Sequence, residues 1–294
     1  MRNAVLFDHK ITNADEMYLA LRDKEHLQPQ REFVEVLWRK YQLHAEKDFK
    51  PEITHHFHQR FWEMYLAVTL LELGFELLPK KKKDPTGPDL CFTDVHQRQV
   101  WLEATAPERG TGVEAVPISR LDTAYYIDEE KILLRLTSAI QAKYEAYKRY
   151  IDKRIVTRDD PCIIAINGWL IPDSSTAGHI PYLVQVALPF GRLSAIYDRE
   201  TLKLIDHGYQ YRPQVAKTTG APVVTDIFLN SDYSQISGLL FSRASAIYPS
   251  SQLGEDFIFL HNPNVRNALE IGWLHRGFEY WLEDNELRNT VWKN

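Results

Sequence analysis

Two carboxylates, each next to or within a short apolar run, occur in the stretch GPDLCFTDVHQRQVWLEATAPERG, which covers residues 87–110. Asp89 precedes the apolar run LCFT, and Glu103 lies within the second run, VWLEATA. If the two runs pair as a hairpin, the two side chains lie beside each other. Adjacent carboxylates repel unless a cation lies between them, and their hard oxygens suit Mg²⁺ or Mn²⁺. The backbone carbonyl of Ala104 adds a third oxygen, so this stretch predicts a divalent-metal site.

A third carboxylate comes from the segment before this stretch. Residues 53–75 have the periodicity of a helix with two nearly opposite apolar stripes, which predicts packing on two sides. Glu63 lies on the narrow side between the stripes, near Gln59 and Ala67. A buried carboxylate is paired, metal-bound or protonated, so Glu63 is a candidate metal ligand or a partner of one. An ordinary place on the helix surface explains it equally well.

The elements that must position these residues follow from the hydrophobic pattern. After the helix at 53–75 come two short strands, DLCFT and VWLEATA, on either side of DVHQRQ. Residues 128–154 form a second amphipathic helix that begins with acidic residues, as the helix dipole favours. The run PCIIAINGW that follows is typical of a strand buried on both faces. Helix, hairpin, helix and buried strand together predict an α/β fold.

The helix bearing Glu63, the pair Pro88–Asp89 and the run WLEAT resemble the PD-(D/E)XK nuclease superfamily. The resemblance covers residues 53–168, with Pro88 and Asp89 matching the first half of the motif and Glu103 its second acid. It implies a restriction-endonuclease-like core, a mixed β-sheet flanked by helices, that holds Mg²⁺ or Mn²⁺ and hydrolyses phosphodiester bonds. The substrate implied by the resemblance is nucleic acid, with DNA favoured.

The motif departs from the superfamily at one position. Thr105 lies on the same strand face as Glu103, two residues on, where the superfamily has lysine. A neutral hydroxyl cannot offset charge that develops at a phosphate. We prefer Lys143 as the replacement, because it flanks the apolar stripe of the helix at 128–154 and can reach inward, although a surface lysine fits the same spacing. The run Lys80–Lys83 is a weaker substitute, since its loop composition predicts solvent around it.

The helix at 128–154 also carries the predicted contacts to nucleic acid. Arg135 and Gln141 lie farther round the helix from Lys143 and are assigned to phosphates. Lys148 and Arg149 belong to a basic patch with interleaved tyrosines, which would bind phosphates with a strong salt dependence. A charged, solvated helix end explains the patch almost as well.

Segments on either side of the core at 53–170 complete the expected organisation. Residues 1–52 are predicted to form a helical appendage, with helices in ADEMYLALRDKEHL and PQREFVEVLWRKYQLHAEK. Residues 171–294 are predicted to form a C-terminal α/β extension packed on the core. Its strands are expected at YLVQVAL, LSAIYD, ISGLLFS and DFIFLHN, with a closing segment at GFEYWLEDNELR.

Composition disfavours several classes of protein. The 294 residues are 44% hydrophobic, which suffices for a sizeable core and argues against disorder. The net charge of −5 leaves no global basic field, so a polyanion needs a local patch. Cys91 and Cys162 lie in apolar stretches and are expected to be reduced core residues, which favours the cytoplasm. Secretion signals, membrane-spanning runs, phosphate loops and nucleophile elbows are not recognised.

Three functional hypotheses remain open on the sequence. The leading one is a divalent-metal-dependent nuclease that acts on DNA. The second is a catalytically inactive protein of the same fold that binds nucleic acid or protein, for which Thr105 is the main argument. The third is an unrelated α/β enzyme that uses a pocket in the second half of the chain. The assembly is also open, with a homodimer as one option.

Overall fold

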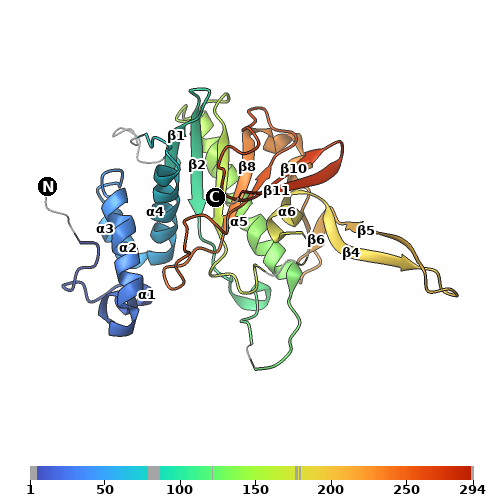
Figure 1. Ribbon diagram of the computed structural model, residues 1–294, viewed down its shortest axis with the longest axis horizontal. Coiled ribbons are helices and arrows are strands. Elements are labelled where there is room, and N and C mark those ends of the chain that lie inside the picture. Colours follow the sequence, from blue (N-terminus) through green and yellow to red (C-terminus); the bar gives the residue numbers. More distant parts are fainter. Residues whose placement is uncertain (1–4, 79–86, 121, 176–177, 179, 293–294) are drawn as a thin grey trace.

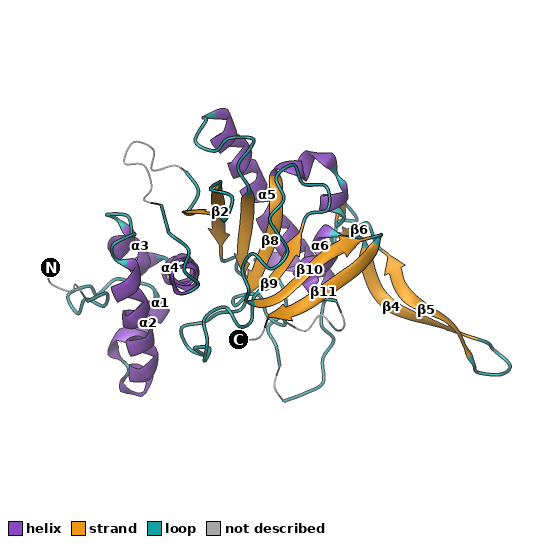
Figure 2. Ribbon diagram, turned by 45° about the horizontal axis from the view of Figure 1, so that its top comes forward, coloured by secondary structure: helices purple, strands orange, loops and turns teal. Residues whose placement is uncertain are grey.

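A seven-stranded mixed sheet forms the centre of the computed structural model, which describes residues 5–292 apart from 79–86, 121, 176, 177 and 179. Its strands lie in the order β1 (Leu90–Thr93), β2 (Gln99–Thr105), β3 (Cys162–Asn167), β8 (Ile236–Ser242), β9 (Ile258–His261), β10 (Gly277–Glu283) and β11 (Glu286–Trp292). Strands β2, β3 and β8 are parallel, as are β9 and β10, and the remaining neighbours are antiparallel. Helices flank the sheet (Figure 2), so the predicted α/β class is confirmed.

Four helices from the N-terminal part lie on one side of the sheet (Figure 1). They are α1 (Glu16–Asp23), α2 (Gln28–Tyr41), α3 (Phe49–His55) and α4 (Phe57–Glu72), with the 3₁₀ turn η1 (Glu25–Leu27) between the first two. The helices predicted within residues 1–52 are therefore present. The single helix predicted over residues 53–75 is wrong in one respect: His56 leaves the helical conformation, with φ −130° and ψ 54°, and separates α3 from α4.

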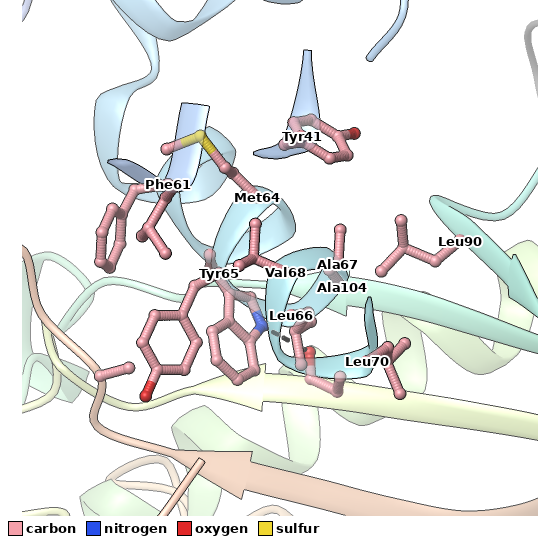
Figure 3. Close-up of a cluster of buried hydrophobic side chains, with 14 of the residues drawn as sticks. Tyr41, Phe61, Met64, Tyr65, Leu66, Ala67, Val68, Leu70, Leu90 and Ala104 are labelled. Carbon is pink, nitrogen blue, oxygen red and sulfur yellow. Dashed lines mark hydrogen bonds between the residues drawn. The ribbon is translucent and has the colours of Figure 1, made fainter. Parts of the chain in front are cut away.

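Helix α4 is buried over most of its surface because it lies between the other N-terminal helices and the sheet. Its buried residues run from Phe57 to Leu70, which confirms the packing on two sides that its two stripes predict. Figure 3 shows this core, in which Met64 and Val68 of α4 lie near Tyr41 of α2, and Ala104 of β2 contributes from the sheet. The N-terminal helices therefore share one hydrophobic core with the sheet.

Helix α5 (Glu129–Asp152) lies on the opposite side of the sheet. Asp128 caps it by accepting a hydrogen bond from the backbone amide of Lys131, as expected for an acidic helix start. Alternation along β2 separates two cores: Leu102 and Ala104 belong to the core under α4, whereas the side chain of Trp101 packs against the core under α5. The face that also carries Glu103 is therefore the α5 face.

The predicted hairpin is confirmed, with Leu90 opposite Leu102 and Thr93 opposite Gln99 in an antiparallel register. Between α4 and the hairpin, Leu77 forms an isolated β-bridge with Phe92. Strand β3 follows α5 and lies parallel to β2. The chain order is thus helix, bridge, hairpin, crossover helix and parallel strand.

The second half of the chain continues the same sheet through β8 to β11 across the expected boundary at residue 170. Strands are present at LSAIYD, ISGLLFS and DFIFLHN, as predicted, but the strand expected at YLVQVAL is wrong because Tyr182–Ala187 form helix α6. A short run buried on all sides has no periodicity that separates strand from helix, and Pro181 favours a helix start. The smaller elements are β4 (Phe190–Tyr197), β5 (Leu204–Tyr211), β6 (Gln214–Ala216), β7 (Pro222–Val224), η2 (Gly112–Glu114), η3 (Ile227–Leu229) and η4 (Ser231–Gln235).

Three further expectations concern the whole chain. Cys91 and Cys162 are both buried thiols, as predicted. The lysine run Lys80–Lys83 lies outside the described residues. Within the described ranges, none of the helices combines the length and the hydrophobicity that crossing a bilayer requires.

Candidate active site

Glu103 is the centre of a polar cluster in an otherwise apolar part of the sheet. Its side chain is only 6% exposed, and its Oε1 atom lies 2.8 Å from the Nζ atom of Lys143 on α5. The hydroxyl of Tyr150, two turns further along α5, donates to the same oxygen over 3.3 Å. Burial and the charges of Glu103 and Asp89 raise the pKa of Tyr150, so this phenol stays protonated and acts as a donor.

The fold of α5 explains why Lys143 reaches Glu103. Leu136, Ile140 and Tyr147 lie on the face of α5 that packs on the sheet, and helical spacing puts Lys143 beside them. The Tyr147 hydroxyl lies 2.8 Å from the carbonyl oxygen of Ile163 and fixes this face on the central strands. The lysine stem therefore runs along the apolar surface and carries the ammonium to the carboxylate.

Asp89 lies immediately before β1, one residue from the pair formed by Leu90 and Leu102, so the register sets it opposite Glu103. Its Oδ2 atom accepts a hydrogen bond of 2.8 Å from the backbone amide of Ala104. Because that amide belongs to the residue after Glu103, the two carboxylates adjoin the same end of β2. The sequence predicts this neighbourhood, and the structure contains it.

The carbonyl oxygen of Ala104 also accepts a hydrogen bond. The side-chain amide of Gln59 donates to this oxygen over 3.2 Å, while the Gln59 Oε1 atom accepts from the backbone amide of Ala106 over 2.8 Å. Helix α4 thus fixes the end of β2 beyond the hairpin. A carbonyl oxygen has a second lone pair, so this contact leaves Ala104 able to bind a further partner.

Glu63 lies on α4 and has hydrogen-bond partners of its own. The carboxylate is fully buried, accepts a hydrogen bond of 2.7 Å from the Tyr41 hydroxyl and lies 2.6 Å from an Arg60 guanidinium nitrogen. Burial lowers the pKa of Arg60, but the charge of Glu63 and its hydrogen bond outweigh this and raise it. Burial, together with Glu63, raises the pKa of Tyr41. Glu63 is therefore a buried charge that is compensated within the N-terminal helices.

The oxygens at the end of β2 suit a hard divalent cation. Asp89 and Glu103 supply carboxylates and Ala104 supplies a carbonyl, which is a donor set that Mg²⁺ and Mn²⁺ accept. Among the residues that the structure describes, no three acidic, histidine or cysteine side chains come close enough to hold a metal ion together. A cation here would use two carboxylates, one carbonyl and several waters, and Mg²⁺ characteristically keeps waters.

The residues predicted to contact nucleic acid lie elsewhere on α5. Arg135, Gln141 and Lys148 line a cavity of about 1060 Å³ that α5 shares with the β6–β7 hairpin and η3–η4. Helical spacing puts Gln141 and Lys148 on the side of α5 turned away from Lys143, whereas Arg135 lies about a quarter turn from Lys143. Arg149 is exposed on the helix surface. The structure therefore does not bring these residues together with Glu103.

Two contributors were missed by sequence reasoning. Tyr150 lies seven residues after Lys143, on the same face of α5, so the helical period contained a signal for it. Gln59 precedes Glu63 by four residues on α4, but its contact with the end of β2 depends on how α4 packs and left no local signal.

Comparison with protein-family models, curated proteins and solved structures found no match for the chain. The mixed α/β fold with helices on both sides of a large sheet is therefore established by the geometry alone. The assignment to a superfamily and to an activity rests on the site and is a proposal.

Proposed function

We propose that this protein is a divalent-metal-dependent nuclease with a restriction-endonuclease-like core, and that DNA is its substrate. The observation that carries the proposal is the contact of 2.8 Å between Lys143 and Glu103, with Asp89 anchored at the end of the same strand. Two carboxylates and a lysine in this arrangement are the groups that the PD-(D/E)XK motif supplies. The motif position for lysine is occupied by Thr105, so the lysine is supplied from α5 by Lys143.

The order of elements supports the proposal independently of the motif letters. Helix α4, the Leu77 bridge, the β1–β2 hairpin, crossover helix α5 and parallel strand β3 follow one another in the chain. This is the order of elements that frames the metal site in the PD-(D/E)XK superfamily. The pattern is long and its elements are spatially adjacent, which makes it more specific than the short motif.

The chemistry assigned to each residue follows from its contacts. Asp89, Glu103 and the Ala104 carbonyl would hold the cation, which when bound polarises a phosphodiester and makes water a better nucleophile. The Lys143 ammonium offsets negative charge that develops at the phosphate. Tyr150 holds the Glu103 carboxylate in place through its hydrogen bond. The buried cysteine thiols fit a reducing compartment, so we assign the activity to the cytoplasm.

A second candidate function is supported by a different observation. Lys143 already pairs with Glu103, and Arg60 already pairs with Glu63, so both acids have cationic partners without a metal ion. A nuclease fold that has lost catalysis and binds nucleic acid or protein would tolerate this arrangement. Thr105 would then mark the position at which the catalytic lysine was lost. This is the alternative against which the nuclease must be tested.

The decisive experiment is a cleavage assay with linear, circular and single-stranded DNA and with RNA, in Mg²⁺, Mn²⁺ or EDTA. The test variant is Glu103→Gln, which keeps the side-chain volume, and the matched control is Glu130→Gln on the exposed surface of α5. Cleavage that needs the metal and is lost only in Glu103→Gln supports the nuclease. Metal-independent binding without cleavage, in folded protein, supports the binding module instead.

A further inference from the structure

A long β-hairpin projects away from the body of the protein (Figure 1). We call it the arm; it consists of β4, β5 and the turn between them, residues 190–211. Within the described residues its two strands pair only with each other, as a separate two-stranded sheet. Every residue of β5 is exposed. Two-stranded hairpins of this kind are marginally stable in water unless another surface covers them.

The root of the arm is firmly attached to the body. The Arg212 guanidinium donates to the Gln185 side chain on α6 over 2.5 Å and to the carbonyl of Phe190 over 3.3 Å. The backbone amide of Arg212 also donates to the Pro189 carbonyl over 2.8 Å. The direction of the arm is therefore fixed where it leaves α6, and its outer part has no covering layer within the described residues.

One face of the arm is an apolar stripe. The register pairs Leu193 with Tyr209 and Tyr197 with Leu204, and opposite residues share a face. Because Leu193 and Tyr197 are four residues apart on one strand, both pairs lie on the same face. These four side chains are between 39% and 59% exposed. The stripe is thus a large apolar surface presented to solvent, which in soluble proteins marks an interaction site.

The charges of the arm indicate what kind of partner fits. Arg192, Arg199 and Lys203 are balanced by Asp198, Glu200 and Asp206, so residues 190–211 carry no net charge apart from His207. A neutral apolar surface does not attract a polyanion such as nucleic acid. An arm with no net charge can approach a second copy of itself without electrostatic repulsion, which fits self-association.

Part of the exposed apolar surface of the arm is available to a second copy. Eight large apolar side chains of the arm are exposed: Leu193, Ile196, Tyr197, Leu202, Leu204, Ile205, Tyr209 and Tyr211. Four of these, Leu193, Tyr197, Leu204 and Tyr209, form the stripe, whereas Ile196 lies on the opposite face of the arm. With roughly 100 Å² exposed on each, the stripe offers about 400 Å², about half of what one partner contributes to an interface of standard size. The stripe therefore supplies the apolar centre of the contact, and polar residues of the arm complete it.

We propose that two copies of the chain form a homodimer through their arms, with the stripe of Leu193, Tyr197, Leu204 and Tyr209 against the same stripe of the second copy. Two hairpins packed face to face bury the apolar side chains between them. The contact is isologous, so it closes at two copies. The proposal does not depend on the nuclease activity.

The mass of the full chain in solution tests the proposal first. Sedimentation equilibrium at micromolar concentration is expected to give a mass near twice the 34.3 kDa of one chain. The double variant Tyr197→Asp with Leu204→Asp places charges in the stripe and should weaken the dimer roughly 100-fold. The control, Val95→Asp, changes an exposed apolar residue away from the arm and should remain dimeric. A wild-type monomer, or a dimer that the double variant leaves intact, would overturn the proposal.

Cross-linking gives a second readout that does not weaken the interface. Ala195→Cys places a thiol on the striped face, and Ser194→Cys places one on the opposite face of the same strand. The natural cysteines are both buried, so a short bismaleimide reagent should react with little else. Efficient dimer cross-linking of Ala195→Cys over Ser194→Cys supports the proposed faces. Equal cross-linking of the two variants contradicts them.

Discussion

The Lys143 ammonium lies 2.8 Å from the Glu103 carboxylate, although the two residues are 40 positions apart in the chain. The proposed nuclease needs this lysine to offset charge at the phosphate, so we expect Lys143→Met to lower metal-dependent cleavage by about 100-fold or more. Cleavage rates under single-turnover conditions measure the effect. Lys24→Met, an exposed lysine just after α1, is the control and should keep most of the rate. Equal loss in both variants would contradict the assignment.

Thr105 allows a rescue experiment. It lies on the same strand face as Glu103 and two residues further on, which is where the PD-(D/E)XK motif has lysine. Adding Thr105→Lys to Lys143→Met should recover at least about 10-fold of the lost rate, because the charge returns to the same region. A fall in thermal stability without recovery would show that a lysine at this position does not reach the site.

Asp89→Asn tests the metal site separately from catalysis. The amide oxygen of asparagine can still accept from the Ala104 backbone, so the fold is retained, but one negative charge is lost. We expect the affinity for Mn²⁺ to fall at least about 10-fold, measured by isothermal titration calorimetry. Asp152→Asn, an exposed residue at the end of α5, should leave it unchanged. Wild-type protein that binds no Mn²⁺ would support the inactive binding module.

Glu63→Ala tests whether this carboxylate stabilises the N-terminal helices. It removes the partner of the Tyr41 hydroxyl and of Arg60 in a fully buried place. We expect the free energy of unfolding to fall by about 3 kcal/mol, because a buried charge loses its partner. Urea denaturation measures this, and Glu72→Ala on the exposed part of α4 should cost less than about 1 kcal/mol. If Glu63→Ala lowered the free energy of unfolding no more than the control does, the pair of Glu63 and Arg60 would contribute little to stability.

His58 predicts a dependence of stability on pH. Burial lowers its pKa to about 4, although its hydrogen bond of 3.0 Å to Asn167 opposes the shift. Between pH 6.5 and 4 the unfolded chain binds a proton at His58 and the folded chain does not, so stability falls as the pH falls through this window. The loss is of order 2–3 kcal/mol. In His58→Gln, the free energy of unfolding should differ between pH 7 and pH 4 by this much less than in the wild-type protein. In His55→Gln, the difference should be unchanged. Titration of the His58 ring near pH 6.5 by NMR would contradict this.

Local periodicity accounts for what could be predicted of the site. Alternation along β2 fixes which side chains share the face of Glu103, and the spacing on α5 fixes that Lys143 lies beside the apolar stripe. The hairpin register follows from two short apolar runs with a turn between them. These patterns are properties of neighbouring residues, so they are readable before the chain folds.

The remaining features depend on packing between distant segments. The partners of Glu63 on α2 and α4 are known only from the tertiary structure. The same holds for the helical conformation of Tyr182–Ala187 and for the cavity that Arg135 and Lys148 line away from Lys143. The sequence by itself determined the class of fold, the neighbouring carboxylates and the inward lysine. What the tertiary structure decided is which buried group meets which partner, because desolvation and close packing select among contacts that local pattern leaves equivalent.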